Sequence, residues 1–239
     1  MQVKTEAIVL SALRYSEADL IVKLFTREEG LKSYLVRGVL KSKRGKIRAS
    51  YFQIFNLLDI DATHKSNNSL HYLKEIKSSH YLQSIHTDVI KGGVITFLAE
   101  IVCQILIDSE PDGQLFDYLK QSVLWLDSNN NIALFHHLFL LKLTNYLGCY
   151  PDTTNEELTE FNLEEGNFAS VSKTVYTIKG ETLASFKLLL GIDFDELNGI
   201  SIPKQVRKNL LNILLLYYNF HVTGYKKPKS LPVLQELFN

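Results

Sequence analysis

One segment of the sequence concentrates positive charge. Residues 37–48 contain six basic residues and no acidic residue, and the six are Arg37, Lys41, Lys43, Arg44, Lys46 and Arg48. Two glycines in the segment are typical of a loop, and like charges on a flexible loop repel one another unless an anion neutralises them. Phosphate backbones supply such an anion, and the release of their counterions favours binding. We therefore predict that this segment binds nucleic acid; the alternative is a solvated basic loop with no ligand.

Aromatic residues accompany the basic segment. Tyr34 precedes it, and Tyr51 and Phe52 follow it. Nucleobases stack on exposed aromatic rings, with a gain of about 1–3 kcal/mol for each base. Most aromatic residues in a small β-barrel fill its core, and neighbouring residues of a strand face opposite ways. At most one of the two later rings can therefore be exposed, and we assign a nucleic-acid contact to Tyr51.

Metal ligands are scarce after residue 80. The candidate soft ligands there are Cys103, Cys149, His136 and His137. Cys103 falls in an apolar stretch with helical spacing, where a buried and inert thiol is usual. Adjacent histidines on one helix point about 100° apart and do not chelate one ion as an i, i+4 pair does. We predict neither a metal site nor a cofactor.

Motifs of nucleotide-binding and hydrolytic enzymes are missing from the sequence. It contains no GxxxxGK[ST] phosphate loop, no GxGxxG turn, no GxSxG elbow and no HExxH helix. We therefore predict that the protein is not an enzyme and acts by binding.

The first 80 residues must position the basic segment, and their pattern is that of strands. Short runs rich in Val, Ile, Leu, Tyr and Phe alternate with turn signals, which predicts strands at 5–15, 20–26, 31–39, 52–61 and 69–79. Five strands in about 80 residues are typical of a small barrel, either an OB-fold or an SH3-like barrel. The basic segment then connects two barrel strands, a place where OB-folds carry ligand-binding loops.

From residue 81 the apolar spacing becomes helical. It predicts helices at 87–107, 112–126, 132–147, 182–190 and 203–222, of which the third is apolar almost all round and central. An irregular or hairpin insert is predicted at about 150–178, and residues 231–237 are apolar enough to pack back on the domain. The predicted fold is therefore α+β with two domains, a small β-barrel (OB-fold) over 1–80 and an all-α domain over 81–239.

Composition and charge exclude several classes of protein. Hydrophobic residues make up 46% and charged residues 22%, which is ordinary for a globular protein, and two cysteines are too few for a disulfide framework. The N-terminus lacks a secretory pattern, which favours a cytoplasmic protein. The net charge of zero hides an asymmetry, because residues 1–80 carry 14 basic and 8 acidic residues and the rest carry 12 and 18. A basic half joined to an acidic half favours different partners for the two.

Five segments along the chain carry a family resemblance. They read YSEADLIVKLFTREEGL at 15–31, VRGVLKSKRGKI at 36–47, IDSEPDGQLFDYL at 107–119, LTNYLGCYPD at 143–152 and YKKPKSLPVL at 225–234. Together and in this order they resemble the bacterial RecO family, the recombination mediators of DNA repair. The resemblance covers nearly the whole chain, and residues 37–48 match the basic barrel segment of the family.

The resemblance implies a non-catalytic function on DNA. It implies an OB-fold that binds single- and double-stranded DNA, annealing of complementary strands, and a cytoplasmic location at the nucleoid. It also implies help in loading RecA onto DNA covered by single-strand binding protein (SSB), together with the partner RecR, in the RecFOR response to DNA damage. The alternative is a protein-interaction adaptor or RNA-binding module that uses the same basic barrel.

A further implication of the resemblance is docking of the acidic, Phe-terminated C-terminal tail of SSB. Such a peptide needs an apolar pocket rimmed by cations. We expect Leu210 and Leu211 to form an apolar wall, and the candidate peptide-binding residues are Lys142, Arg207, Lys208, Leu211, Lys226 and Lys227. The alternative is that these cations only keep a helical surface soluble.

The chain departs from the family in one respect. Many members carry a cysteine-rich zinc finger just after the segment that matches 143–152. Here residues 151–175 contain no cysteine, and Cys149 stands alone before them. We therefore expect no zinc-dependent function, and at most a metal-free hairpin in place of the finger.

Overall fold

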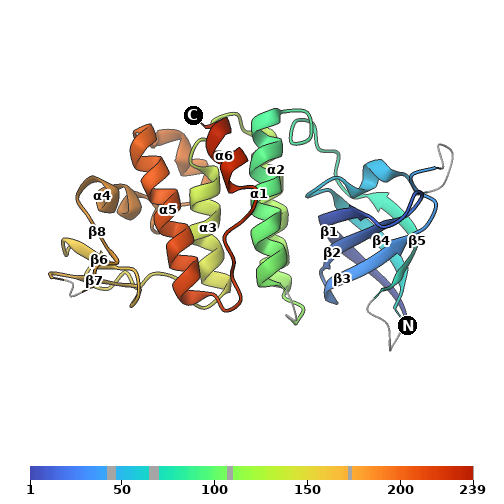
Figure 1. Cartoon of the computed structure of the whole chain (residues 1–239), viewed down its shortest axis with the longest axis horizontal. Coiled ribbons are helices and arrows are strands. Elements are labelled where there is room, and N and C mark those ends of the chain that lie inside the picture. The colour runs from blue at the N-terminus through green and yellow to red at the C-terminus, as the bar shows by residue number, and fades with distance from the viewer. Residues whose placement is uncertain (42–46, 65–69, 107–109, 172–173, 239) are drawn as a thin grey trace. The chain divides into compact units, whose positions relative to one another are not determined.

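The structure is a computed structural model that describes residues 1–41, 47–64, 70–106, 110–171 and 174–238 (Figure 1). Its contacts divide the chain into two compact units, Met1–Ser128 with Pro228–Leu237, and Asn129–Lys227 with Phe238–Asn239. The division into domains 1–80 and 81–239 stays a prediction about which parts fold independently. Among the described residues, no helix is long and apolar enough to cross a membrane.

The first unit contains a five-stranded antiparallel sheet. Its strands are β1 (Gln2–Arg14), β2 (Leu20–Thr26), β3 (Gly30–Val36), β4 (Leu57–Thr63) and β5 (Tyr72–Ser78), in the order β3-β2-β1-β4-β5. The two edge strands of this order, β3 and β5, are also linked by hydrogen bonds near the start of β5. The Leu35 N–H donates to the His71 carbonyl (3.0 Å) and the His71 N–H donates to the Ser33 carbonyl (2.8 Å). This contact brings β3 alongside the start of β5, and the predicted OB-like barrel is confirmed.

Several predicted strand boundaries are wrong by a few residues, and two of them lie beside the basic segment. The third strand ends at Val36 rather than 39, because Gly38 has a φ of +68° and its N–H donates to the Asp19 carboxylate (2.8 Å), which turns the chain. The fourth strand begins at Leu57 rather than 52, because the residues before it form a short 3-10 helix, η1 (Ala49–Phe52). That helix places the Phe52 side chain in the barrel core.

Three helices complete the first unit: α1 (Val89–Ile105), α2 (Gly113–Ser128) and α6 (Leu231–Leu237). Helix α6 packs on α1, where the Glu100 carboxylate accepts hydrogen bonds from the backbone N–H groups of Lys229 (2.7 Å) and Ser230 (3.0 Å). The Leu237 side chain lies against Gly93 of α1, in space that a Cβ atom would fill. The predicted return of residues 231–237 onto the domain is confirmed.

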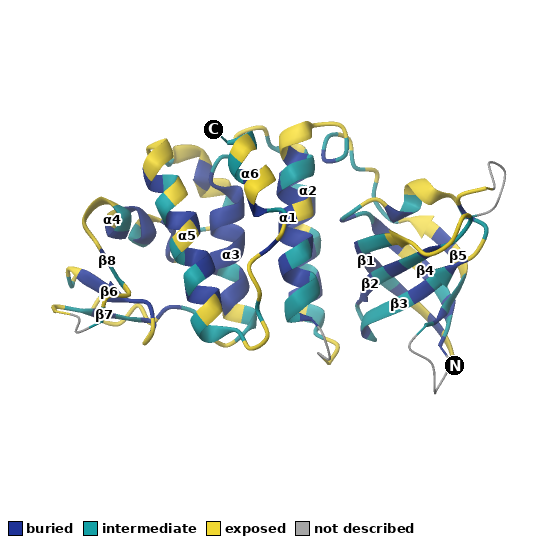
Figure 2. Ribbon diagram, in the orientation of Figure 1, coloured by how far each residue is buried: buried dark blue, intermediate teal, exposed yellow. Residues whose placement is uncertain are grey.

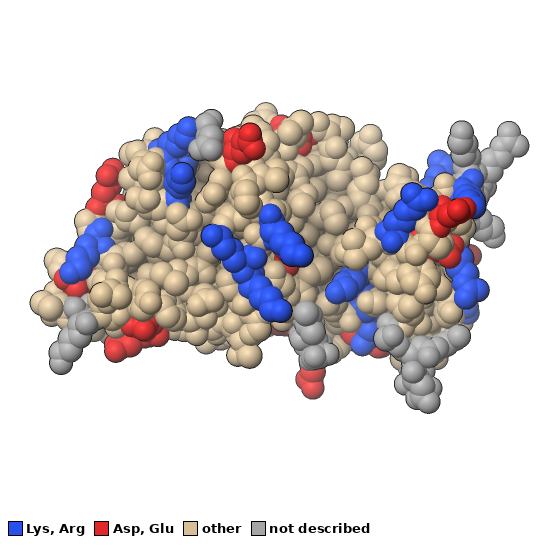
Figure 3. All heavy atoms as spheres, viewed as in Figure 1, with Lys and Arg blue, Asp and Glu red and all other residues tan. Residues whose placement is uncertain are grey.

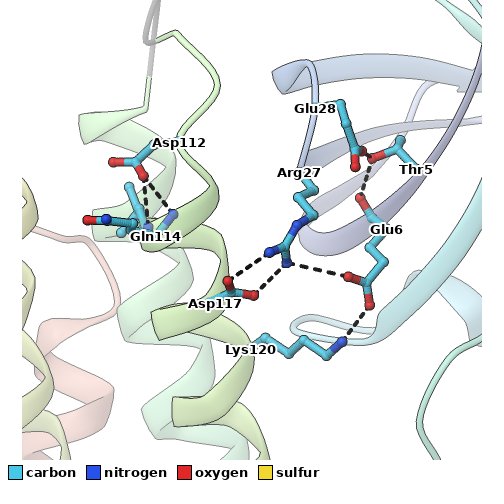
Figure 4. A network of polar contacts seen from close by, with 9 residues as sticks. Thr5, Glu6, Arg27, Glu28, Asp112, Gln114, Asp117 and Lys120 are labelled. Carbon is cyan, nitrogen blue, oxygen red and sulfur yellow. Dashed lines mark hydrogen bonds and ion pairs between the residues drawn. The ribbon is translucent and has the colours of Figure 1, made fainter.

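A charged network joins the barrel to α2 (Figure 4). The Arg27 guanidinium makes a two-pronged contact with the Asp117 carboxylate (Nη2–Oδ2 2.8 Å) and lies 3.5 Å from the Glu6 carboxylate, which also pairs with Lys120. Hydrogen bonding to Arg27 holds the pKa of Asp117 below its usual range. These cations already have protein partners, so they are poor candidates for binding phosphate.

The second unit surrounds a buried helix. It contains α3 (Phe135–Tyr146), α4 (Gly180–Leu189), the 3-10 helix η2 (Phe194–Gly199) and α5 (Lys204–His221). Most residues of α3 are buried, as the dark blue ribbon shows, so the predicted central helix is confirmed (Figure 2). The insert forms the predicted hairpin from β6 (Glu160–Asn162) and β7 (Asn167–Ala169), and β8 (Thr177–Lys179) adds a third strand that the sequence did not predict.

Candidate nucleic-acid interface

The barrel core anchors both ends of the basic segment. Val36 just before it and Phe52 just beyond its end are 4% and 3% exposed, and within it Val39 and the partly buried Ile47 pack against the same core. Between these anchors the described basic residues are exposed, and they are Arg37, Lys41 and Arg48. Lys43, Arg44 and Lys46 lie outside the described residues. The fold therefore holds the two ends of the segment at the barrel surface.

The described cations of the segment make only weak internal contacts. The Lys41 ammonium lies 2.9 Å from the Glu17 carboxylate, and both side chains are well exposed to solvent. The Arg37 guanidinium lies over the ring of Tyr72, 5.6 Å from its centroid. Exposed ion pairs contribute about 0–1 kcal/mol, so exchanging Glu17 for a phosphate costs little. These side chains are free enough to accept an anionic ligand.

The aromatic rings near the segment are more buried than the sequence suggested. Tyr34 lies wholly within the barrel core, where its hydroxyl is hydrogen-bonded to His64 Nε2 (2.9 Å). Tyr51 lies on η1 rather than on a strand, and its ring is half-buried against the core. Phe52 is buried. A nucleobase contact through Tyr51 stays a prediction, but the freely exposed ring that we expected is not formed because a helical turn replaces the strand.

The barrel has an acidic side that sequence reasoning missed. Acidic residues on β1, β4 and β5 and in the turn between β2 and β3 line a hollow of about 410 Å³, together with Lys4 and Lys77. They are Glu6, Asp59, Asp61, Glu75 and, in the turn, Glu28. Asp61 accepts a hydrogen bond from the Gln2 amide (2.9 Å). This side repels phosphates, so a DNA strand must approach the barrel elsewhere. Only the strand register brings these residues together, which is why their spacing gave no signal.

The predicted peptide-binding residues belong to the second unit. Lys142 pairs with Asp193, and the Arg207 guanidinium donates to the Ile202 carbonyl (2.7 Å). Lys208, Lys226 and Lys227 are exposed. Leu210 and Leu211 are 0% and 4% exposed, so they belong to the core and cannot present the apolar wall that we expected. The helical period identified their apolar face but not the neighbours that cover it.

The described residues do not fit a zinc site. No group of three or more His, Cys, Asp or Glu side chains converges within the part of the chain that the structure describes. Burial raises the pKa of the Cys149 thiol. It also raises the pKa of Cys103, to about 11, and both shifts disfavour the thiolates that zinc requires. The insert is held instead by aromatic packing, because the ring centroid of Phe161 lies 5.0 Å from those of both Phe168 and Phe186.

Comparison with known proteins covers both halves of the chain. Residues 1–82 match the family model for the N-terminal part of recombination protein O, and residues 86–232 match the model for its C-terminal part. A protein of Christiangramia forsetii named DNA repair protein RecO is 45% identical over 238 residues, which cover 100% of both chains. Its namesake in Flavobacterium psychrophilum is 42% identical over 239 residues, again with full coverage of both. The chain therefore belongs to the RecO family of DNA repair proteins.

Proposed function

We propose that this protein binds DNA through the basic segment of its barrel and anneals complementary single strands without catalysing a chemical reaction. In the cell it acts in the cytoplasm, at the nucleoid, and with RecR it helps load RecA onto single-stranded DNA covered by SSB. The observation that carries the proposal is the exposure of Arg37, Lys41 and Arg48 between two core-anchored ends. Membership of a family named for DNA repair supports it.

The mechanism follows from charge neutralisation. Two complementary strands repel each other through their phosphates, and this repulsion slows their encounter. Cations on the barrel replace condensed counterions along one strand, which lowers its effective charge and lets a second strand approach. The acidic hollow on β1, β4 and β5 keeps the bound strand to one side of the barrel. Base pairing then supplies the free energy of annealing, so no hydrolysis of a nucleotide is needed.

Removing the central charges of the segment tests this mechanism. In a K43A/R44A/K46A variant we expect weaker binding to all DNA sequences and a salt slope of log K that is flatter by up to about three units, if all three meet phosphates. A matched control is K4A/K77A, which removes lysines that line the acidic hollow and should leave the slope unchanged. Fluorescence anisotropy at several salt concentrations measures the affinity and the salt slope of each variant.

A strand-annealing assay with and without SSB separates the candidate functions. We expect the parent protein to accelerate annealing and the triple variant to lose most of this effect. DNA binding by the triple variant equal to that of the parent at every salt concentration would move the site away from the segment. An adaptor that grips acidic proteins would show no annealing, and an RNA-binding module would prefer RNA of the same sequence.

We propose further that the tail of SSB binds the second unit through Lys142, Arg207, Lys208, Lys226 and Lys227. Because Leu211 is buried, the apolar contact for the terminal phenylalanine has to come from other residues. An R207A/K208A variant of the full chain should bind a tail peptide roughly tenfold more weakly, on the scale of one charged hydrogen bond. Isothermal titration at low and high salt measures this, and undiminished binding by the variant would exclude these two residues.

A further inference from the structure

Phe238 packs against the start of α3. Its ring centroid lies 4.9 Å from that of His136, with an angle of 42° between the two ring planes. His136 is 2% exposed and Phe238 is half-buried. Phe238 belongs to the second unit, as α3 does. The second unit therefore has a seat for one phenylalanine ring beside His136, and Phe238 fills it.

Arg207 lies beside this seat. The ring centroids of His136 and His137 are 4.1 Å apart, and His137 Nε2 lies 2.8 Å from the Arg207 carbonyl. Burial is the main cause that lowers the pKa of both rings, and the positive charge of Arg207 lowers it further, so the guanidinium lies within electrostatic reach of the seat. In the space-filling view, blue side chains lie beside the point that Figure 1 marks as the C-terminus (Figure 3). A seat for an aromatic ring and a cation at its rim therefore occur together.

The Arg207 guanidinium can bind a carboxylate at this place. Its Nη1 donates to the Ile202 carbonyl (2.7 Å), which is a neutral acceptor, and a guanidinium has five N–H donors in all. Hydrogen bonds between a guanidinium and a carboxylate are roughly twice as strong as those between neutral groups. An acidic peptide that ends in phenylalanine needs both an apolar seat for its ring and a cation for its carboxylates. The surroundings of Phe238 supply both.

The segment that carries Phe238 has part of the chemistry of such a peptide. Residues 236–238 read Glu-Leu-Phe, so a carboxylate precedes the phenylalanine by two positions. Glu236 is exposed and Phe238 is half-buried. A half-buried ring leaves its seat more easily than a fully buried one, because less apolar surface is transferred to water. Phe238 is therefore an occupant that a stronger ligand can displace.

We propose that Phe238 occupies the seat that the terminal phenylalanine of the acidic tail takes on binding, so that this protein's own side chain and the tail compete for it. This inference rests on the proposed binding of the SSB tail and names a regulation of that same site. Only molecules in which Phe238 has left the seat bind the tail with full affinity, so the apparent affinity is reduced by their fraction. A peptide with only carboxylates or only an aromatic ring gains too little to displace Phe238, and the competition thus favours tails that carry both.

The test uses an F238A variant of the full chain and two peptides, the acidic tail peptide and the same peptide with its terminal phenylalanine replaced by alanine. F238A should bind the tail peptide about fivefold or more tightly than the parent does, because its seat is already empty. It should bind the alanine peptide as the parent does, because that peptide does not use the seat. V233A is the matched control, since Val233 is 58% exposed on α6 and its replacement should change neither affinity. Isothermal titration measures the affinities, and urea unfolding shows that the variants are folded.

The possible outcomes separate this inference from the proposed function. Equal affinity of F238A and the parent for the tail peptide, with the loss in R207A/K208A intact, would overturn the competition and leave the proposed tail site standing. Weaker binding by F238A would also overturn it, because Phe238 would then belong to the surface that the tail contacts. The same holds for an equal gain with both peptides. F238L keeps an apolar side chain in the seat and should give a smaller gain in the same direction, which keeps the test decisive if F238A is unstable. Absence of tail binding by the parent and by both variants would remove both proposals.

Discussion

Replacing Phe161 by alanine should lower the free energy of unfolding by about 3–5 kcal/mol, which is the usual cost of removing a buried aromatic side chain. Phe161 is fully buried in β6 at the centre of the insert. Its ring contacts those of Phe168 and Phe186, and the Tyr217 ring of α5 lies 6.3 Å away between centroids. Alanine would leave a cavity where β7, α4 and α5 meet β6.

In the insert, aromatic packing takes the place that a metal would have. Urea unfolding of the parent should give the same midpoint with and without a chelator, because packing rather than ligation holds the sheet. F161L keeps most of the buried volume and should cost less than about 1.5 kcal/mol. V175A serves as the control within the insert, since Val175 is 89% exposed and its replacement should change stability by less than about 0.5 kcal/mol. A loss of stability on chelation would show that zinc, not the aromatic cluster, organises this region.

Local patterns predicted most of the elements because those patterns have local physical causes. The prediction of a strand at 20–26 matches β2 residue for residue, since alternate side chains enter the barrel core. The predicted helix at 203–222 differs from α5 by one residue at each end. The predicted start of the fourth strand was wrong because Phe52 is buried in a helical turn, and an apolar residue at this position fits a strand equally well. A buried aromatic residue does not tell a strand from a helical turn that fills the same core.

The candidate binding surface was predicted from the sequence only where its residues are contiguous. The charges of residues 37–48 are visible in the sequence because they follow one another along one loop. The acidic hollow was missed because Glu6, Asp59 and Glu75 belong to three different strands and become neighbours only through strand register. A shift of one residue in that register would turn each side chain to the other face. Composition and spacing carry no information about such a shift.

Burial of polar groups was equally hidden from the sequence. Lys91 near the start of α1 is 1% exposed, although lysine is almost never fully buried without partners. Its ammonium donates to Ser84 Oγ (2.6 Å) and to the Asp127 carbonyl (3.0 Å). The Asp127 carboxylate in turn accepts hydrogen bonds from three successive backbone N–H groups before α1. Ser84 lies before α1 begins and Asp127 lies 36 residues away, so helical spacing predicts neither contact.

The protein should lose stability in mild acid because two histidines of α3 are buried in the neutral form. His136 and His137 are each 2% exposed. Burial lowers the pKa of His137 to about 4 and that of His136 well below its usual value. The unfolded chain takes up these protons near pH 6.5, whereas the folded chain does not, so acid favours unfolding. For His137 alone the loss amounts to about 3 kcal/mol between pH 6.5 and pH 4.

The geometry at His137 explains why its protonated form is excluded. His137 Nε2 lies 2.8 Å from the Arg207 carbonyl, so this nitrogen carries the proton and donates it. The other ring nitrogen, Nδ1, is buried and has no hydrogen-bond partner among the described residues. Protonation there would bury both a charge and a donor without an acceptor, and the positive charge of Arg207 opposes it further.

An H137Q variant isolates this effect, because the glutamine amide can still donate to the Arg207 carbonyl but does not titrate. We expect the slope of unfolding free energy against pH to be smaller in H137Q by up to one proton, or about 1.4 kcal/mol per pH unit, between pH 6.5 and pH 4. Urea unfolding at half-unit pH intervals measures the slope in both proteins. Carboxylates contribute equally to the two curves and cancel in their difference. Parallel curves over this range would mean that His137 takes up its proton in the folded state, which contradicts the buried neutral ring.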